Sequence, residues 1–225
     1  MDRVEIFRSI LRLLTPGTLL DLGAGHGSFS IAARDLGWAV TAVDARTERT
    51  PYAPGITWVE SDVRDFEFEK VDVVAILGLF YHLERSDQLA LLQRCAGMTT
   101  IIDTHVSLRP LVEDGGYVGH YFEEVLDAPT ASWKNNMSFW PTEDSLLRMM
   151  ARTHPTQMKV LPEHAVGRTF YVGSVLPAAE WVPLVRSFNT KYRYKLEVQR
   201  PTSSKATKRP ATPTRWLRRE PEQSD

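Results

Sequence analysis

Cysteine and long hydrophobic runs are scarce in this chain. Cys95 is its only cysteine, which excludes a disulfide framework and a metal cluster held by several thiolates. No apolar run approaches the roughly 20 residues that a membrane-spanning helix needs. The first residues are acidic and lead into an amphipathic pattern, unlike a secretion signal. We therefore expect a chain without a membrane span that works in the cytoplasm.

The whole chain also lacks a strong net charge, although its two segments are each strongly charged. The 225 residues carry a formal net charge of -1. Residues 1–185 contain 16 Lys and Arg against 24 Asp and Glu, a net charge of -8, whereas residues 186–225 contain 11 against 4, a net charge of +7. The composition of the first segment suits one globular domain. We predict a folded domain over 1–185 and a basic, largely flexible tail over 186–225.

Short apolar segments alternate with amphipathic ones through the first half of the chain. Helices are expected at 4–14, 28–36, 86–96 and 142–152, and strands at 18–22, 39–43, 56–60, 71–77, 99–103, 157–161 and 168–176. This order predicts an α/β fold with a Rossmann-like, doubly wound sheet. The sheet should be mostly parallel, with a terminal antiparallel hairpin. Residues 104–141 interrupt the alternation and are predicted to form a lid on the acceptor side.

A glycine-rich segment follows the first predicted strand. Residues 19–27 read Leu-Leu-Asp-Leu-Gly-Ala-Gly-His-Gly, and glycines at alternate positions allow a tight turn and the close approach of a ligand. The spacing differs from the G-x-G-x-x-G of dinucleotide sites. Asp21 would repel a pyrophosphate but would attract an ammonium group. A plain strand-to-helix turn remains the structural alternative.

Acidic residues end the next two predicted strands. Asp44 ends the second strand, where a carboxylate can accept the hydroxyls of a ribose, and Asp62 follows the third. Together with the glycine segment, this pattern resembles the class I S-adenosylmethionine-dependent methyltransferases over roughly residues 15–176. The resemblance implies that Asp44 holds the ribose and Asp62 the adenine of S-adenosylmethionine. The full set of expected cofactor-binding residues is Asp21, Gly23, Gly25, Gly27, Asp44, Asp62 and Leu79.

Two histidines follow the strands whose ends should face the acceptor. His82 lies after the fourth strand and His105 after the fifth, and either could act as a general base near neutral pH. Asp103, His105 and Glu124 could instead bind a divalent cation such as Mg²⁺. For each histidine a purely structural role is an equal alternative.

Aromatic residues are concentrated in the predicted lid. Residues 119–124 and 133–142 resemble the lid of bacterial methyltransferases that act on sugars and polysaccharides. We therefore expect O-methylation of a hydroxyl on a saccharide or another small molecule. A weaker resemblance, over residues 79–82 and 136–147, is to the transfer RNA wobble-uridine carboxymethyltransferases. The alternatives are thus an RNA-modifying enzyme that uses the basic tail, a role not favoured by the acidic domain, and a non-catalytic scaffold. The oligomeric state is left open.

Overall fold

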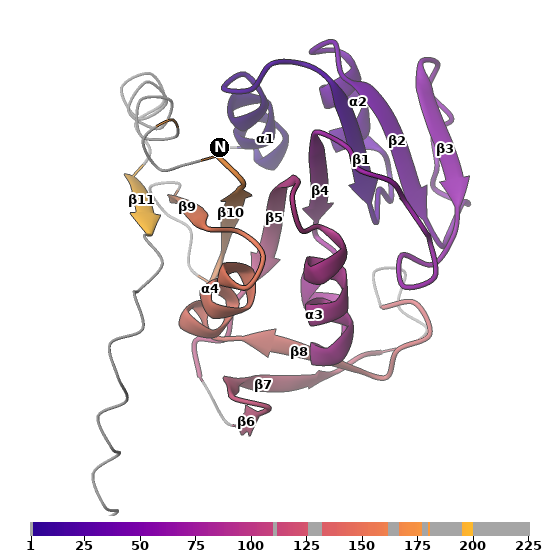
Figure 1. The fold of residues 1–225 in the computed structure, drawn as a ribbon. Coiled ribbons are helices and arrows are strands. Elements are labelled where there is room, and N and C mark those ends of the chain that lie inside the picture. Colours follow the sequence, from indigo (N-terminus) through magenta and orange to yellow (C-terminus); the bar gives the residue numbers. More distant parts are fainter. Residues whose placement is uncertain are drawn as a thin grey trace, which may run out of the picture.

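The computed structural model describes residues 2–109, 112–125, 132–161, 167–176, 180 and 195–199. The elements follow one another as α1 (Arg3–Leu11), β1 (Thr18–Leu22), α2 (Ser28–Arg34), β2 (Ala39–Asp44), β3 (Ile56–Glu60), β4 (Val73–Leu77), η1 (Phe80–His82), α3 (Arg85–Arg94), β5 (Thr99–His105), β6 (Val112–Asp114), β7 (Tyr117–Glu123), β8 (Met137–Pro141), α4 (Glu143–Ala151), β9 (Thr156–Leu161), β10 (Arg168–Ser174) and β11 (Lys195–Gln199). Figure 1 shows this arrangement. Within the described residues, no helix is long and apolar enough to cross a membrane.

The main sheet has eight strands in the order β11-β9-β10-β5-β4-β1-β2-β3. Neighbouring strands from β5 to β3 are parallel, and β10 and β9 add to the other edge in antiparallel register. The predicted α/β class, the parallel sheet and the antiparallel hairpin are confirmed. The chain reverses its strand order between β1 and β4, which is where open α/β sheets bind ligands.

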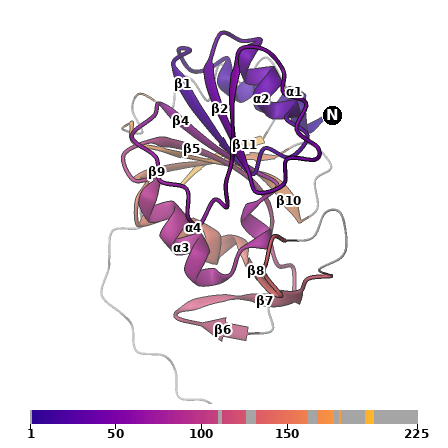
Figure 2. The same ribbon diagram turned by 90° about the vertical axis from the view of Figure 1, so that its right-hand side faces the viewer.

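Helices cover both faces of this sheet, as expected for a doubly wound fold. Residues of β4 alternate between two hydrophobic cores: Val73, Ala75 and Leu77 face one core, and Val74 and Ile76 face the other. Helices α1 and α2 contribute to the first core, and α3 and α4 to the second. Figure 2 shows the sheet between these two pairs of helices. Burial on both faces explains why the central strands read as continuous apolar runs.

The predicted lid region contains a second, three-stranded antiparallel sheet, in the order β6-β7-β8. It lies beyond α3 and α4 in both ribbon views (Figures 1 and 2). The buried Gln88 amide of α3 donates to the backbone oxygens of Phe80 and Phe139, at 2.9 and 2.6 Å, and so joins η1 to β8. The backbone N–H of Phe139 donates to Leu83 O at 2.9 Å. The lid is therefore attached directly to the segment that follows β4.

The structure differs from the sequence expectation at the chain's basic end. Lys195–Gln199, assigned from composition to the flexible tail, form β11 and pair with β9 in antiparallel register. Leu196 and Val198 alternate with polar residues in the sequence, a pattern that is typical of an edge strand. The basic residues around them led to the prediction of a flexible tail instead. The remainder of the predicted tail, together with residues 181–185, lies outside the described residues.

Candidate active site

The glycine segment forms the turn between β1 and α2. Gly23, Gly25 and Gly27 have φ values of 76°, 52° and 68°, a left-handed conformation that side chains with a Cβ disfavour. A Cβ at Gly27 would lie 2.5 Å from the Trp58 ring, and one at Gly23 would lie 2.9 Å from Leu79 Cβ. A Cβ at Gly25 would meet nothing within 4 Å. Gly27 and Gly23 therefore serve packing, whereas Gly25 leaves open space beside the backbone for a ligand.

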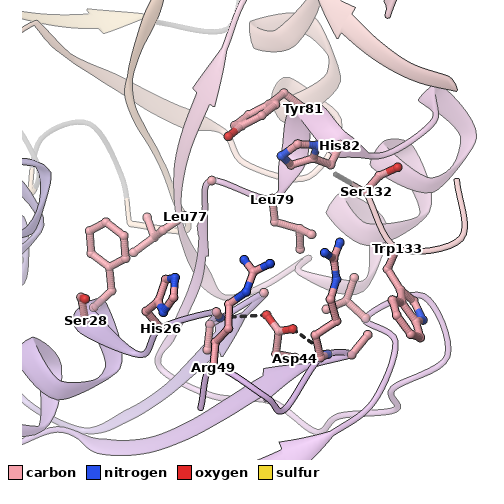
Figure 3. Close-up of a pocket in the computed structure, with 18 of the residues that line it drawn as sticks. His26, Ser28, Asp44, Arg49, Leu77, Leu79, Tyr81, His82, Ser132 and Trp133 are labelled. Carbon is pink, nitrogen blue, oxygen red and sulfur yellow. Dashed lines mark hydrogen bonds between the residues drawn. The ribbon is translucent and has the colours of Figure 1, made fainter. Parts of the chain in front are cut away.

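Asp44 connects this turn to the end of β2. Its Oδ2 accepts the backbone N–H of Gly25 and its Oδ1 that of Arg46, both at 2.8 Å. Figure 3 shows the carboxylate on the cavity wall with both bonds dashed. Each carboxylate oxygen can accept more than one hydrogen bond. Asp44 is therefore fixed in place and still able to accept the two hydroxyls of a ribose.

Asp21 is buried in β1, 1% exposed, and does not line the cavity. Its Oδ2 accepts the Ser30 hydroxyl at 2.5 Å, while its Oδ1 has no hydrogen-bond partner within the described part of the chain. Burial raises the pKa of Asp21 to about 6, and the nearby Asp44 charge adds to this effect. Asp21 can thus act on a cationic ligand through its charge from behind the glycine turn, without direct contact at the wall.

Asp62 lies on the cavity wall and is paired with Arg64. The Arg64 guanidinium donates to both Asp62 oxygens, at 2.5 to 3.1 Å, and to Trp133 O at 3.0 Å. Burial alone would raise the pKa of Asp62, but the hydrogen bonds from Arg64 hold it below its usual value. An ionised Asp62 is thereby tied to the lid segment that carries Trp133.

These residues border a cavity of about 540 Å³ at the carboxyl ends of the parallel strands. Figure 3 shows Asp44 and Arg49 on one side of it, with Tyr81, His82 and Ser132 facing them. The remaining lining residues come from α1, the glycine turn, the start of α2, the end of β4, the loops after β2, β3 and β4, the lid and β10. Of the expected cofactor-binding residues, the cavity wall includes Gly23, Gly25, Asp44, Asp62 and Leu79.

His82 and Glu124 form a hydrogen-bonded pair at the acceptor side of the cavity. His82 lines the cavity, and its Nδ1 lies 2.8 Å from Glu124 Oε1. The Glu124 side chain is 4% exposed, and its other oxygen accepts the backbone N–H of Ser132 at 3.2 Å. Asn135 Nδ2 donates to His82 O at 2.9 Å. Because Nδ1 is occupied by a carboxylate, Nε2 is the nitrogen that can receive a proton.

His105 is placed differently and does not line the cavity. Its Nε2 lies 3.1 Å from Nη1 of Arg168. A guanidinium only donates hydrogen bonds, so Nε2 must accept and its lone pair is occupied. Burial, and then the Arg168 charge, lower the pKa of His105 and keep the ring neutral. The geometry favours His82 over His105 as a base.

The three residues expected to bind a metal are not brought together. Asp103 is held by the guanidiniums of Arg3 and Arg168, Glu124 by His82, and His105 Nε2 by Arg168. In the part of the chain that the structure describes, no group of three His, Cys, Asp or Glu side chains could hold a metal ion. The metal-site expectation is not supported: Glu124 is hydrogen-bonded to His82, and Asp103 is paired with two arginines.

Sequence reasoning missed the arginines of the cavity. Five arginines and three aspartates line it: Arg3, Arg46, Arg49, Arg64 and Arg168, with Asp2, Asp44 and Asp62. The body is acidic overall, so its net charge gave no sign of this local excess. Arg46 and Arg49 closely follow Asp44 in the sequence, and Arg64 closely follows Asp62. Only these three could have been predicted to line the cavity from their sequence positions. Arg3 and Arg168 come from opposite ends of the domain.

Comparison with known proteins agrees with this geometry. A family model described as a methyltransferase domain matches residues 2–153. The N-terminal domain of EvdMO1 with S-adenosylhomocysteine (SAH) bound is 23% identical, with a TM-score of 0.66 over 77% of this chain and 81% of that chain. Burkholderia thailandensis 1,6-didemethyltoxoflavin-N1-methyltransferase is 20% identical, with a TM-score of 0.56 and 76% of each chain covered. The glycopeptide N-methyltransferase MtfA complexed with S-adenosylmethionine (SAM) is 20% identical, with a TM-score of 0.53 over 79% of this chain and 88% of that chain. No curated protein matches in sequence.

The fold and the site thus define a methyltransferase. The chain belongs to the class I SAM-dependent methyltransferases, since the family match spans more than half of it. The resemblance carried by the glycine segment and the two strand-end aspartates is confirmed.

Proposed function

We propose that the cavity binds SAM and that His82 receives the proton of a hydroxyl acceptor, on a saccharide or another small molecule. The observation that carries this proposal is the His82–Glu124 pair on the cavity wall. A hydroxyl is a poor nucleophile unless its proton is removed as the new bond forms. A histidine held by a buried carboxylate has a fixed tautomer and orientation for this task.

The cofactor fits the residues of the wall. Gly25 leaves space beside its backbone, and Asp44 offers acceptors to a ribose. Behind the wall, the buried Oδ1 of Asp21 has no hydrogen-bond partner among the described residues, and the charge of this carboxylate favours a cationic cofactor. When bound, SAM supplies a methyl group on a sulfonium, which is a good leaving group. The protein's own contribution is then to position the acceptor and to take up its proton at His82 Nε2.

The saccharide acceptor has independent support. The EvdMO1 domain has also been solved in the presence of SAH and D-fucose, at 22% identity and a TM-score of 0.66. The wall of the cavity in this protein includes Tyr81 and Trp133, and aromatic faces with nearby polar groups suit sugar rings. Some of the similar structures are N-methyltransferases. Methylation of an amine is therefore the competing function, since a positioned base would also take up the proton of an amine.

The cofactor half of the proposal is tested by calorimetry with SAH. Asp44→Asn removes a charged acceptor and should weaken binding roughly tenfold to hundredfold, because hydrogen bonds to a charged group contribute about 1.5–3 kcal/mol. Asp65→Asn is the matched control, since Asp65 is exposed and does not line the cavity. A wild-type chain that does not bind SAH would overturn the proposal.

The acceptor half is tested with SAM carrying a labelled methyl group and a panel of saccharides and amines, beginning with D-fucose. His82→Ala should lower the transfer rate by about 100-fold or more and leave SAH affinity unchanged. His105→Ala is the comparison variant, because that ring lies behind the wall. Label found only on amines, or full activity in His82→Ala, would contradict the assignment.

A further inference from the structure

Residues 132–136 of the lid form a strap that contacts both halves of the site. Ser132 and Trp133 line the cavity, and Figure 3 shows them on one segment. Lys134, the next residue, has a φ of 51°, a left-handed conformation that residues with a Cβ disfavour. Such a conformation persists only where the surrounding contacts hold it. The contacts of the strap therefore decide where Trp133 and its neighbours lie.

Arg64 joins the strap to the cofactor half of the site. Its Nη2 donates to Trp133 O at 3.0 Å. Its Nε and Nη2 also reach both oxygens of Asp62, at 2.5 to 3.1 Å, and its Nη1 lies 3.9 Å from Asp87 Oδ2 of α3. Each nitrogen of the guanidinium thus has a partner, and this planar set of donors is particular to arginine.

The same strap holds the proposed base. The backbone N–H of Ser132 donates to Glu124 Oε2 at 3.2 Å, and Glu124 Oε1 lies 2.8 Å from His82 Nδ1. Asn135 Nδ2 donates to His82 O at 2.9 Å. Asn136 O accepts the backbone N–H of Glu124 at 2.9 Å. The strap therefore fixes both the ring and the backbone of His82.

A ligand that covers Asp62 would act on these contacts by excluding water. Asp62 and Arg64 both line the cavity, and their side chains are 15% and 28% exposed. Where water is excluded, a broken hydrogen bond leaves its donor and acceptor without a replacement partner, so opening becomes more costly. A bound cofactor should accordingly strengthen the hold of Arg64 on Trp133 O. The adjacent residue, Ser132, passes this hold on to Glu124.

We propose that Arg64 is a positioning residue that couples occupancy of the cofactor site to the placement of His82. It acts through the strap, so the base is held most firmly when the methyl donor is bound. This inference rests on the proposed function, because it assumes that the cavity binds SAM beside Asp62. The coupling is reciprocal: a firmer strap must raise the affinity for the cofactor by the same factor.

The test measures hydrogen exchange at the backbone amide of Glu124, with and without saturating SAH. This amide bonds to Asn136 O, and Glu124 does not line the cavity, so its exchange reports on the strap without direct cover by the ligand. In wild type, SAH should slow the exchange about fivefold or more, the lower end of ordinary coupling between sites. Arg64→Lys keeps a positive charge beside Asp62, but its single nitrogen cannot reach every partner of the guanidinium. It should bind SAH and show no slowing.

Arg34→Lys is the matched control. The Arg34 side chain is also 28% exposed, it donates to Asp35 Oδ1 at 2.7 Å and to Pro54 O at 2.9 Å, and it does not line the cavity. This variant should show the same slowing as wild type.

Asn135→Ala tests the reciprocal effect, because Asn135 holds His82 and does not line the cavity. Calorimetry should show SAH binding weakened by about fivefold in Asn135→Ala. The same change made in the Arg64→Lys background should have no further effect, since the connection is already lost.

The inference is overturned if SAH slows exchange at Glu124 equally in wild type and Arg64→Lys, or binds to wild type without slowing it. Loss of SAH binding in Arg64→Lys would also overturn it, since Arg64 would then be needed for binding itself. Unchanged SAH affinity in Asn135→Ala would contradict the reciprocal effect and overturn the coupling. Failure of the wild type to bind SAH would instead overturn the proposed function.

Discussion

Asp21 is a buried carboxylate that the fold holds at a cost in stability. Its pKa is raised from 3.8 to about 6, chiefly by burial. The unfolded chain should titrate near the ordinary value, so the folded protein binds this proton more tightly. The contribution of Asp21 to stability is then complete below about pH 4 and is lost as the pH rises through about 6.

The size of this loss follows from the two pKa values. At about 1.36 kcal/mol for each tenfold change in proton affinity, the change from 3.8 to about 6 corresponds to roughly 3 kcal/mol at pH 8. Asp21→Asn stays neutral and avoids the loss. The amide can still accept from Ser30, but its NH₂ group takes the place of the unpartnered Oδ1, which costs roughly 1 kcal/mol. We expect a net stabilisation of about 2 kcal/mol at pH 8.

The assay is urea and thermal unfolding of wild type and Asp21→Asn at pH 4.5 and pH 8. At pH 8 the variant should melt roughly 5 °C higher, from about 2–4 °C per kcal/mol for a chain of this size. At pH 4.5 the folded wild type is still mostly protonated and loses only about 1 kcal/mol, because the unfolded chain alone is largely ionised there. This loss matches the roughly 1 kcal/mol cost of the amide, so the difference should vanish. The same variant should bind SAM more weakly at pH 8, since a negative charge near a cationic ligand has been removed.

Asp62→Asn is the control, because the Arg64 hydrogen bonds lower the pKa of Asp62 despite its partial burial. Its ionised form therefore stabilises the fold at pH 8, and the same substitution should destabilise there. The reasoning is refuted if Asp21→Asn is no more stable than wild type at pH 8. It is equally refuted if the stabilisation is the same at both pH values.

Two further predictions concern the turn and the histidine. Gly27→Ala should destabilise the fold by roughly 2 kcal/mol or more, because its φ is positive and its Cβ would strike Trp58, whereas Gly25→Ala should cost about 1–2 kcal/mol and mainly reduce SAH affinity. Unfolding measures the loss of stability in both variants, and calorimetry measures their SAH affinity. Equal losses of stability in the two variants would contradict this prediction. Neutral His82 should carry its proton on Nδ1, opposite Glu124, and Glu124→Ala should shift it toward the Nε2-protonated form. ¹⁵N spectra of the imidazole measure this, with Glu123→Ala as the exposed neighbouring control; an unchanged tautomer in Glu124→Ala would argue against the pairing.

The cofactor half of the site was predictable because its signals are local. The strand that ends at Leu22, the glycine turn and the next strand ending at Asp44 occupy one continuous segment. Their hydrophobic pattern fixes the sheet, and a parallel sheet brings its carboxyl strand ends to one edge. Placing Asp44 and Gly25 in contact required only the correct strand order.

The acceptor half could not be derived in this way. Glu124 and His82 are 42 residues apart, and Asp103 and Arg168 are 65 apart. The sequence predicts that Glu124 completes a metal site with Asp103 and His105, whereas the structure pairs it with His82. Its partner depends on how β7 and β8 fold back over η1, and the aromatic, irregular pattern of residues 104–141 does not specify that pairing.

The two halves of the site are held by different parts of the molecule. Asp44 and Gly25 are fixed by the main sheet and the turn between β1 and α2. His82 is fixed by the lid: Glu124 holds its ring, Asn135 holds its backbone oxygen, and β8 pairs with the residue that follows it. Changes in the lid can therefore move or remove the base without disturbing Asp44 and Gly25. The acceptor should accordingly be sought from the chemistry of the lid, because the glycine turn and Asp44 constrain only the cofactor.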